Sequence, residues 1–571
     1  MLKKLIVPAL LMVICFGCKK KEAVKPIVVP PPPDTAAVIG KPNNQHVSVL
    51  TQHNDNTRAG FNNHETTLTT SNVNSSQFGL LFTLNVDDQV YAQPLVYSKL
   101  NIGGGTHNAV FIATVTNSVY AFNADNGHLF WKKNFTVSGQ RPPNASDMSS
   151  SWCTPYGDIS SNIGIIGTPV IDSASKTIYF VARSTDGINY SQYLHAVSLT
   201  TGADKTGSPV LITASVPGTG DGNVAGTVSF DPRRNNQRQA LTLVNGIVYV
   251  SFSSHCDWNP YHGWILGYNA ATLAQQTVYN DTPNGEEGGL WESGMGVAAD
   301  AQGNLYVVSG NGTVGKPTSY SAGGNGTSEN SSSSDPTDPS GRAESAIKLT
   351  PSGGTLKVSS YFTPTTYVDM NVNDLDYGVM GTLLIPNTNY YLTGAKDGNL
   401  YLLNKDNMGG YSNIGNLVQQ TIPLSVSLHC QPAYYRGAVN EYVYVWSEYD
   451  QLRAMAFNRG TGKFASGQIT SPAPGPVGPS GADLSVSSNG NADGTGILWA
   501  AYGTSGDAGG SVGPGILRAF DANDITKELW NSDQNAADRL GSYAKFCSPT
   551  VANGHVYMGT FSNRVAVYGL K

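Results

Sequence analysis

Charged residues are scarce in this chain of 571 residues. Asp, Glu, Lys and Arg make up 13% of it, about half of their usual share in globular proteins. The 34 basic and 40 acidic side chains leave a net charge of −6, and no Lys/Arg-rich run occurs after residue 48. Because proteins that bind nucleic acids present a basic face to the phosphates, the sequence excludes a nucleic-acid partner.

Cysteine is also rare, and the spacing of the six cysteines matches no redox or metal motif. The sequence contains no C-x-x-C and no C-x-x-C-H. These absences argue against a c-type haem, a zinc ribbon and a thioredoxin-like centre. Four cysteines follow the N-terminal region, namely Cys153, Cys256, Cys430 and Cys547. In the oxidising space outside the cytoplasm, some of them can pair.

Long apolar runs are missing except at the start of the chain. MLKK is followed by LIVPALLMVICF and then by Gly17 and Cys18. Residues 1–17 therefore read as a signal peptide, too short for a comfortable membrane span. Their Gly-Cys end resembles a bacterial lipoprotein signal, which implies cleavage before Cys18 and a lipid on its thiol. Cleavage without lipidation is the alternative.

A Lys- and Pro-rich tether, residues 18–48, is predicted after the signal. Its prolines favour extended polyproline II, a semi-rigid spacer. Lipid chains anchor a protein to a membrane surface without spanning it. We therefore expect a domain held in the cell envelope at the outer membrane, on its periplasmic side or at the surface.

Glycine and tyrosine are abundant, with 64 and 29 copies, and they recur in a repeating pattern. Eight successive units each show a strand often carrying an early Pro, a VYV-like strand, a LYAF-like strand and a final strand. The eighth unit lacks its final strand, and a lone strand of that type occurs at 78–86. The pattern predicts an all-β fold, an eight-bladed β-propeller of four-stranded antiparallel blades over 78–571, closed by the N-terminal strand. Seven blades are the alternative if the seventh unit is misread.

The segment 49–77 precedes the ring and contains QHNDNTRAG, which is too polar for a core strand. Two placements are open for it: it lies across a face of the propeller, or it plugs the channel.

Long insertions fall mainly in connections that share one face of such a ring, at 137–163, 213–237, 255–263, 281–293, 311–345 and 470–481. Because loops on a rigid scaffold carry function, this face is the candidate working surface. Cys153 and Cys256 lie in loops of this face in adjacent blades, and we expect a disulfide between them. Cys430 and Cys547 begin inner strands with a blade between them, too far apart to bridge, and are expected to be buried thiols.

The stretches SVYAFNADNGHLFW (118–131) and LRAFDANDITKELW (517–530) resemble the repeat of the eight-bladed pyrroloquinoline-quinone propeller superfamily, in which a strand, an Ala-x-Asp-x-x-Gly turn and a Trp recur. The resemblance covers roughly residues 75–571. SHCDWNPYHGWILGY (254–268) is also similar to a subgroup of exported bacterial propellers. The superfamily contains quinone-dependent alcohol and sugar dehydrogenases and also propellers that bind no quinone. The resemblance thus implies the fold, and function must be argued from a site.

A quinone-dependent dehydrogenase of this superfamily is expected to need four groups near the axis. These are a Trp under the quinone, oxygen ligands for calcium, Arg or Lys for the quinone carboxylates, and a carboxylate base. Many alcohol dehydrogenases of this group also carry two adjacent cysteines, which this sequence lacks. The resemblance therefore leaves pyrroloquinoline quinone and calcium open as cofactors.

Candidate ligand- or cofactor-binding residues lie in the loops that lead into the inner strands. They are Arg234, Arg238, His255, Asp257, His262, Glu286, Glu287, Trp291, Glu292 and His429. Asp374 and Asp376 in NDLDYG form a possible calcium corner, and the loop from His255 to His262 could hold zinc or copper. The competing interpretations are solvated capping loops, ion pairs between blades and ordinary turns.

Three functions remain open from the sequence. The first is binding of a protein or carbohydrate ligand on the loop face, since Tyr and Trp interleaved with Asn, Asp and Gly suit such contacts. The second is a quinone- and calcium-dependent dehydrogenase of alcohols or sugars, which is the favoured activity if the protein is an enzyme. The third is a lyase or hydrolase of acidic polysaccharide that uses His255 or His262 with the arginines.

Overall fold

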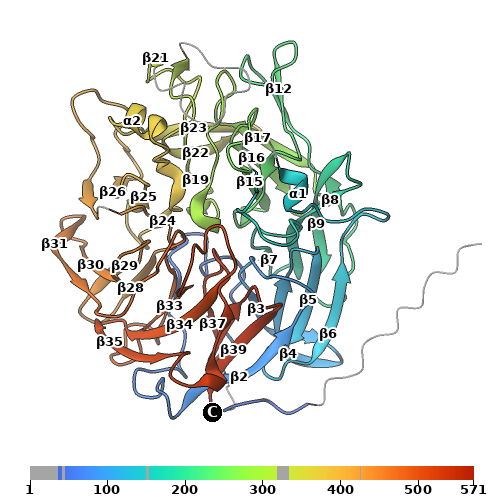
Figure 1. Cartoon of the computed structure of the whole chain (residues 1–571), viewed down its shortest axis with the longest axis vertical. Coiled ribbons are helices and arrows are strands. Elements are labelled where there is room, and N and C mark those ends of the chain that lie inside the picture. Colours follow the sequence, from blue (N-terminus) through green and yellow to red (C-terminus); the bar gives the residue numbers. More distant parts are fainter. Residues whose placement is uncertain (1–35, 42–44, 150–153, 318–332, 425) are drawn as a thin grey trace, which may run out of the picture.

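The structure is a computed structural model that describes residues 36–41, 45–149, 154–317, 333–424 and 426–571. Eight four-stranded antiparallel blades follow one another around a ring (Figure 1). This arrangement confirms the predicted all-β propeller and its count of eight blades. The signal peptide, Cys18 and most of the tether lie outside the described residues.

Blades 1 to 4 each run from an innermost strand outward. Blade 1 is β3 (Leu95–Ile102), β4 (Gly105–Ala113), β5 (Ser118–Asn123) and β6 (Leu129–Asn134). Blade 2 is β7 (Val170–Asp172), β8 (Thr177–Thr185), β9 (Tyr190–Ser198) and β10 (Val210–Leu211). Blade 3 has β13 (Asn235–Asn236) and β14 (Thr242–Val244) on β15 (Ile247–Ser254), then β16 (Trp264–Asn269) and β17 (Gln275–Asn280). Blade 4 is β18 (Ala298–Ala299), β19 (Leu305–Val308), β22 (Ala346–Ser352) and β23 (Thr355–Phe362).

Blades 5 to 8 continue the ring in the same order. Blade 5 is β24 (Leu383–Leu384), β25 (Tyr390–Gly394), β26 (Asn399–Asn404) and β27 (Gln420–Pro423). Blade 6 is β28 (Ala433–Arg436), β29 (Glu441–Val445), β30 (Arg453–Asn458) and β31 (Lys463–Thr470). Blade 7 is β32 (Asp483–Ser487), β33 (Ile497–Gly503), β34 (Pro514–Asp521) and β35 (Asp524–Asn531). Blade 8 is β37 (Thr550–Ala552), β38 (His555–Gly559), β39 (Arg564–Leu570) and β2 (Phe78–Asn85).

Short elements decorate this ring. They are β1 (Phe61–Asn62), β11 (Ser215–Pro217), β12 (Thr227–Ser229), β20 (Lys316–Pro317), β21 (Ser333–Asp335), β36 (Gly541–Ser542), the helices α1 (Ala145–Met148) and α2 (Tyr367–Val372), and the 3-10 turns η1 (Glu292–Gly294), η2 (Tyr377–Val379) and η3 (Ala536–Asp538). Among the described residues, no helix combines the length and the apolar character needed to cross a membrane.

The ring closes through β2, the strand predicted from 78–86. It pairs antiparallel with β39, from Phe78 opposite Leu570 to Asn85 opposite Arg564. The first strand of the propeller in sequence thus completes the last blade. Closure pairs one edge of β39 that would otherwise be open to another chain.

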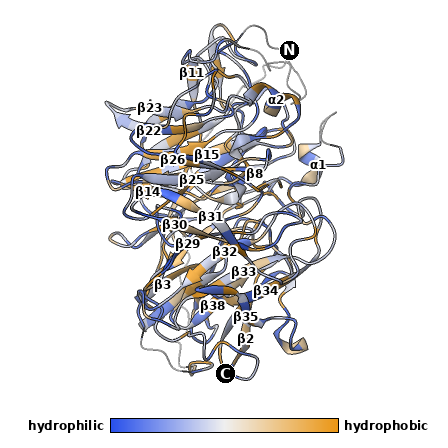
Figure 2. Cartoon of the chain, turned by 90° about the vertical axis from the view of Figure 1, so that its left-hand side faces the viewer, coloured by the Kyte–Doolittle hydropathy of each residue, from blue (hydrophilic) through white to orange (hydrophobic). Residues whose placement is uncertain are grey.

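The repeated Trp joins neighbouring blades. The Trp131 Nε1 donates a hydrogen bond of 2.8 Å to the carbonyl of Leu199 in the next blade. Trp530, at the end of blade 7, packs edge-on against Phe78 and Tyr568 of blade 8. Apolar side chains fill the spaces between blades, and Figure 2 shows apolar and polar residues interleaved along the strands. The recurring motif is therefore explained by blade packing.

The N-terminal extension plugs the channel, which decides between the two placements left open by the sequence. Its residues contact the innermost strand of every blade in order. The contacts join Val49 to Val96, Leu50 to Ile171, Asn56 to Leu243 and Ala299, Thr57 to Leu384, Ala59 to Tyr434, Gly60 to Val486, and Asn62 to Val551. We call residues 49–62 the axial plug. Because it visits all eight blades, the plug ties the ring together from the inside.

Candidate functional site

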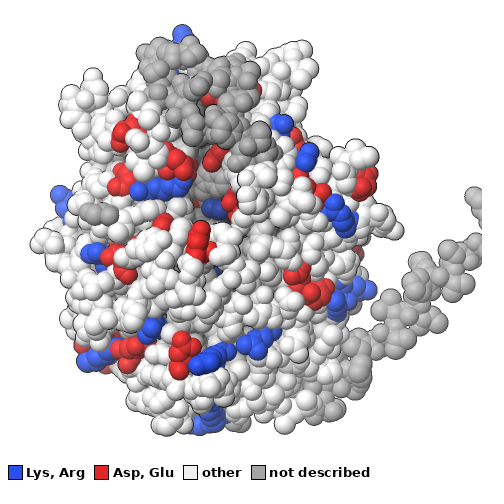
Figure 3. All heavy atoms as spheres, in the orientation of Figure 1, with Lys and Arg blue, Asp and Glu red and all other residues white. Residues whose placement is uncertain are grey.

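A pocket of about 450 Å³ lies at the mouth of the channel where the inner strands begin; we call it the axial pocket. Three of the predicted long loops, 137–163, 255–263 and 470–481, contribute residues to its lining. The lining residues are Thr154, Pro155, Gly157, Asp158, Arg238, Cys256, His429, Pro479, Ser480, Asp507, Gly509, Gly510, Lys545 and Phe546. Figure 3 views the loop face, where acidic and basic side chains form small mixed groups around a central hollow.

Arg238 is the predicted residue with the most distinctive surroundings. Its guanidinium lies over the rings of Phe546 at 4.7 Å and Trp291 at 5.1 Å. Its Nε donates to the Trp291 carbonyl at 3.1 Å. Within the described part of the chain, no carboxylate pairs with this guanidinium, and burial lowers its pKa. The cation is therefore held by its stem and its π contacts, with its two terminal nitrogens left for a ligand.

The terminal nitrogens of the two fully buried arginines are bound by protein acceptors, in contrast to those of Arg238. Arg58 in the plug donates to six acceptors of the plug and of blades 3 and 4. Arg183 donates to His255 and to the carbonyls of Pro232 and Arg233. Their guanidinium groups have structural partners, so they are not candidates for ligand binding.

Lys545 brings a second cation to the axial pocket. It is buried, its Nζ donates to the Gly509 carbonyl and lies 5.6 Å from the centre of the Phe546 ring. Burial lowers the pKa of its ammonium to about 8. Near neutral pH this group is therefore charged and close to the point at which it releases a proton.

His429 lines the same pocket and is held by a carboxylate behind it. Its Nδ1 is hydrogen-bonded to Glu448 Oε1 and lies 3.0 Å from Ser427 Oγ. Burial lowers the pKa of His429, although the Glu448 carboxylate acts in the opposite direction. A neutral imidazole that donates from Nδ1 carries its lone pair on Nε2. The Glu448 contact thus fixes the tautomer in which Nε2 accepts protons.

No protein-family model matches this chain, and no curated protein matches it. Solved structures with the same fold are found at low identity. They include the quinohemoprotein alcohol dehydrogenase from Comamonas testosteroni, with 13% identity, a TM-score of 0.57 and coverage of 91% of this chain and 80% of that one. Quinohemoprotein alcohol dehydrogenase ADHIIG from Pseudomonas putida HK5 is 15% identical, with a TM-score of 0.53 and coverage of 92% of this chain and 80% of that one. A europium-containing methanol dehydrogenase is 12% identical, with a TM-score of 0.54 and coverage of 92% of this chain and 99% of that one. At this identity the likeness shows a shared propeller fold.

The axial pocket fits one part of the quinone cofactor that the family resemblance left open. Arg238 and Lys545 would suit its carboxylates. Its flat ring needs an open indole face, however, and Trp291 is largely buried with Arg238 lying over it. In the described ranges no group of three or more His, Cys, Asp or Glu is arranged to hold a metal ion. The residues therefore do not fit the quinone ring together with its cation.

Asp374 and Asp376, the predicted calcium corner, share a lysine. The Lys396 Nζ lies 2.9 Å from Asp374 Oδ1 and 2.6 Å from Asp376 Oδ2. The Asn311 side chain also donates to Asp374. An ammonium thus provides the positive charge between these carboxylates.

His255 and His262, the predicted polysaccharide-cleaving histidines, are buried and both ring nitrogens of each are engaged. His255 lies between the Tyr156 hydroxyl at 2.6 Å and Arg183 Nη1 at 2.8 Å. His262 contacts Thr282 Oγ1 and the Asp221 carbonyl. Burial lowers the pKa of both imidazoles. These histidines hold loops in place beside the axial pocket and are not among its lining residues.

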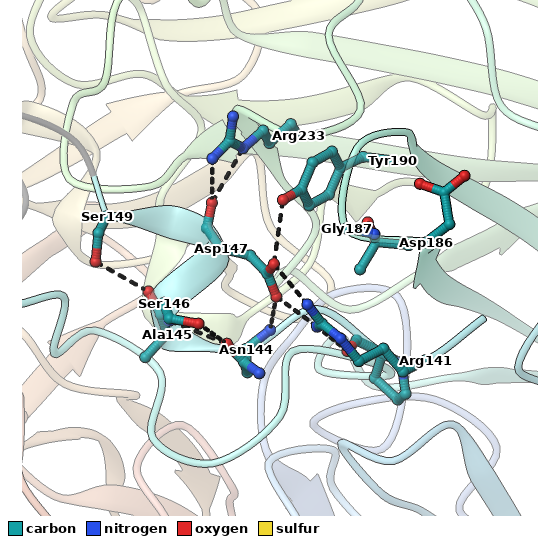
Figure 4. Close-up of polar contacts among 12 residues, drawn as sticks. Arg141, Asn144, Ala145, Ser146, Asp147, Ser149, Asp186, Gly187, Tyr190 and Arg233 are labelled. Carbon is teal, nitrogen blue, oxygen red and sulfur yellow. Dashed lines mark hydrogen bonds and ion pairs between the residues drawn. The ribbon is translucent and has the colours of Figure 1, made fainter.

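Arg233 and Arg234 belong to loop packing. The Arg233 Nε and Nη2 donate to the Asp147 carbonyl at 3.0 and 2.6 Å, and its guanidinium lies 4.8 Å from the Tyr190 ring (Figure 4). The Asp147 carboxylate in turn binds Arg141 and the Tyr190 hydroxyl. Arg234 lies 3.6 Å from Asp231 and stacks on Trp258. Arg233 thus binds a backbone carbonyl and Arg234 pairs within its own loop, which differs from the ion pairs between blades that were the alternative to ligand binding.

The acidic candidates Glu286, Glu287, Glu292 and Asp257 are not among the residues that line the pocket. Glu286 and Glu292 are buried, and Glu292 accepts a hydrogen bond from the Val308 N–H. Asp257 accepts from the Tyr261 hydroxyl at 2.7 Å, and burial raises the pKa of its carboxyl. Glu287 accepts from Asn259 Nδ2 at 2.7 Å.

The structure describes three of the four cysteines that follow the N-terminal region. Cys430 and Cys547 are free and buried, as expected. Cys153 lies outside the described residues, so its predicted disulfide with Cys256 stays a prediction.

Because the pKa of buried Glu287 is raised, we expect the stability of the fold to depend on pH. Burial, followed by the charge of Glu286, raises its pKa from 4.5 to about 8. The folded protein therefore holds this proton more tightly than the unfolded chain, and the associated stability is lost as the pH rises through 8. Between pH 6 and 9 we expect a loss on the order of 2 kcal/mol from this group. Glu287→Gln should reduce the fall in urea-unfolding free energy, and an unchanged fall would contradict the assignment.

The site residues that sequence reasoning missed are Lys545, Phe546 and Glu448. The position of Phe546 could have been found by aligning the repeats. Phe546 precedes Pro549 by three residues, just as His429 precedes Pro432. Both prolines open an inner strand, so equivalent positions meet at the channel mouth. Glu448 carries no such signal because its loop brings it to His429 from the second strand of the blade.

Proposed function

We propose that this protein is a lipid-anchored, exported propeller of the cell envelope that binds a carboxylate-bearing glycan in the axial pocket. The observation that carries the proposal is the half-buried Arg238 guanidinium, which lines the pocket and forms no direct ion pair with a carboxylate of the described ranges. The charge of Asp158 acts on Arg238 without a direct ion pair. A ligand carboxylate that takes both terminal nitrogens would therefore supply the charge-assisted hydrogen bonds that this guanidinium lacks.

The rest of the lining favours a sugar over a peptide side chain. Asp158, Ser480 and Asp507 offer oxygen acceptors for hydroxyl groups, and the loops between them are rich in Gly and Pro. The Phe546 ring is covered by Arg238 and Lys545, which leaves little open apolar surface. A polar recess of about 450 Å³ suits one end of an acidic saccharide.

Binding of acidic oligosaccharides tests this proposal. Calorimetric titration with oligogalacturonate, oligoalginate and hyaluronan fragments should give saturable binding to at least one of them. Arg238→Gln should weaken that binding about tenfold to 100-fold, since a charge-assisted hydrogen-bond pair contributes about 1.5–3 kcal/mol.

The matched control is Arg436→Gln. Arg436 is exposed and lines a pocket beside the plug, so its loss should leave affinity unchanged. Equal affinity of the Arg238 variant and the parent, or no binding of any acidic saccharide, would contradict the proposal. Binding of pyrroloquinoline quinone with calcium, followed by dye reduction with alcohols or sugars, would replace it with the dehydrogenase.

A further inference from the structure

The axial pocket contains a histidine–carboxylate pair with the orientation of a general base. Glu448 engages Nδ1 of His429, and no hydrogen-bond partner of Nε2 is present in the described part of the chain. The His429 side chain is 24% exposed and lines the pocket, whereas the Glu448 side chain is 10% exposed. A buried carboxylate that orients an imidazole is the usual way to aim its second nitrogen at a substrate proton.

Three groups of different chemical character line this one pocket. His429 presents a proton acceptor, Lys545 a cationic proton donor, and Arg238 an unpaired guanidinium. A guanidinium bound to a carboxylate stabilises the negative charge that develops when the neighbouring carbon loses its proton. The combination is that of proton abstraction next to a carboxylate, followed by departure of a group on the adjacent carbon.

We propose that the axial pocket cleaves uronate-containing glycans by β-elimination, with His429 as the base, Lys545 as the acid and Arg238 on the uronate carboxylate. His429 Nε2 takes the proton from C5, and the electrons of that C–H bond form the C4=C5 double bond. The C4–O glycosidic bond breaks, and its oxygen takes a proton from the Lys545 ammonium. The two proton transfers balance, and no oxidant or added water is consumed.

Glu448 is a positioning residue in this scheme. Its carboxylate keeps the Nδ1 proton in place and so keeps Nε2 free. This proposal rests on the proposed binding of an acidic glycan, which supplies the carboxylate for Arg238.

The test is formation of the unsaturated uronide, followed by ultraviolet absorbance and mass spectrometry, with polygalacturonate, alginate and hyaluronan as substrates. The parent protein should release products with a C4=C5 double bond from at least one of them. His429→Gln should lower kcat about 100-fold or more, the usual contribution of a general base, while calorimetric affinity for the same oligosaccharide stays within about twofold. Glu448→Gln should lower kcat with little change in KM.

His195→Gln is the matched control. His195 forms a similar pair, with its Nδ1 3.0 Å from Asp204 Oδ1, on a blade strand outside the pocket, so its variant should keep full activity. Binding of the glycan without any unsaturated product would overturn the elimination and leave the proposed binding function standing. Absence of binding would overturn both. Full activity in the folded His429 variant would also overturn the assignment of the base.

Discussion

Replacing Arg58 by methionine should destabilise the folded ring by about 3–5 kcal/mol, the usual cost of removing one partner from a buried charged network. Arg58 is fully buried in the axial plug. Its Nη2 donates to the carbonyls of Leu241 and Val297 and to Thr242 Oγ1 at 2.6 Å. Methionine has a similar length and no donor, so these acceptors would lose their partner inside the channel. Unmet buried acceptors cost about 1–3 kcal/mol each.

Urea unfolding of the full chain checks this expectation. Arg436→Met is the control, because Arg436 is exposed at the end of an inner strand near the plug, and surface substitutions usually change stability by no more than about 0.5 kcal/mol. If the Arg58 variant unfolded at the same urea concentration as this control, the plug would not stabilise the ring. A change in the slope of the transition would indicate that the plug leaves the channel before the blades unfold.

The architecture was predictable because the same strand pattern occurs eight times. A pattern that recurs in register reports the same packing environment in each blade, so errors in one copy are corrected by the others. Closure was predictable for a related reason. The eighth unit lacks a strand and residues 78–86 supply it, and only pairing of β2 with β39 satisfies both facts.

The candidate site was only partly predictable, since loops carry no such repetition. Arg238 and His429 were named from the sequence and do meet in the axial pocket. His255 was named by the same reasoning, but its two nitrogens are engaged by Tyr156 and Arg183. Sequence shows that a histidine lies in a loop, whereas the path of the loop decides whether the imidazole faces a pocket or a neighbour.

The plug is an intermediate case. The stretch QHNDNTRAG (52–60) in the predicted extension 49–77 was recognised as too polar for a core strand, yet its position could not be chosen. His53 illustrates why: its Nε2 contacts Ser548 Oγ at 2.7 Å and its Nδ1 contacts the Arg58 carbonyl. The environment that makes this polar histidine acceptable comes from blade 8, nearly 500 residues away, and no local pattern reports it.

Phe78→Ala should also destabilise the ring by about 3–5 kcal/mol, as expected for truncation of a fully buried aromatic ring. Phe78 is the first residue of β2, the strand that completes blade 8. Its ring centre lies 5.0 Å from that of Trp530 and 5.4 Å from that of Trp499, both in blade 7. It stacks on Tyr568 of blade 8 as well. One side chain thus fixes the closing strand to its own blade and the last blade to its neighbour.

Phe82→Ala on the same strand is the matched control, because Phe82 is only partly buried, and we expect it to cost less than half as much. Thermal unfolding followed by tryptophan fluorescence suits the comparison, since Trp499 and Trp530 report directly on the closure. Equal losses in the two variants would contradict a special role of Phe78. A Phe78 variant whose Trp fluorescence shifts at a lower temperature than its far-ultraviolet circular dichroism would show that the ring opens at this seam before the blades unfold, because the two probes coincide in a single cooperative transition.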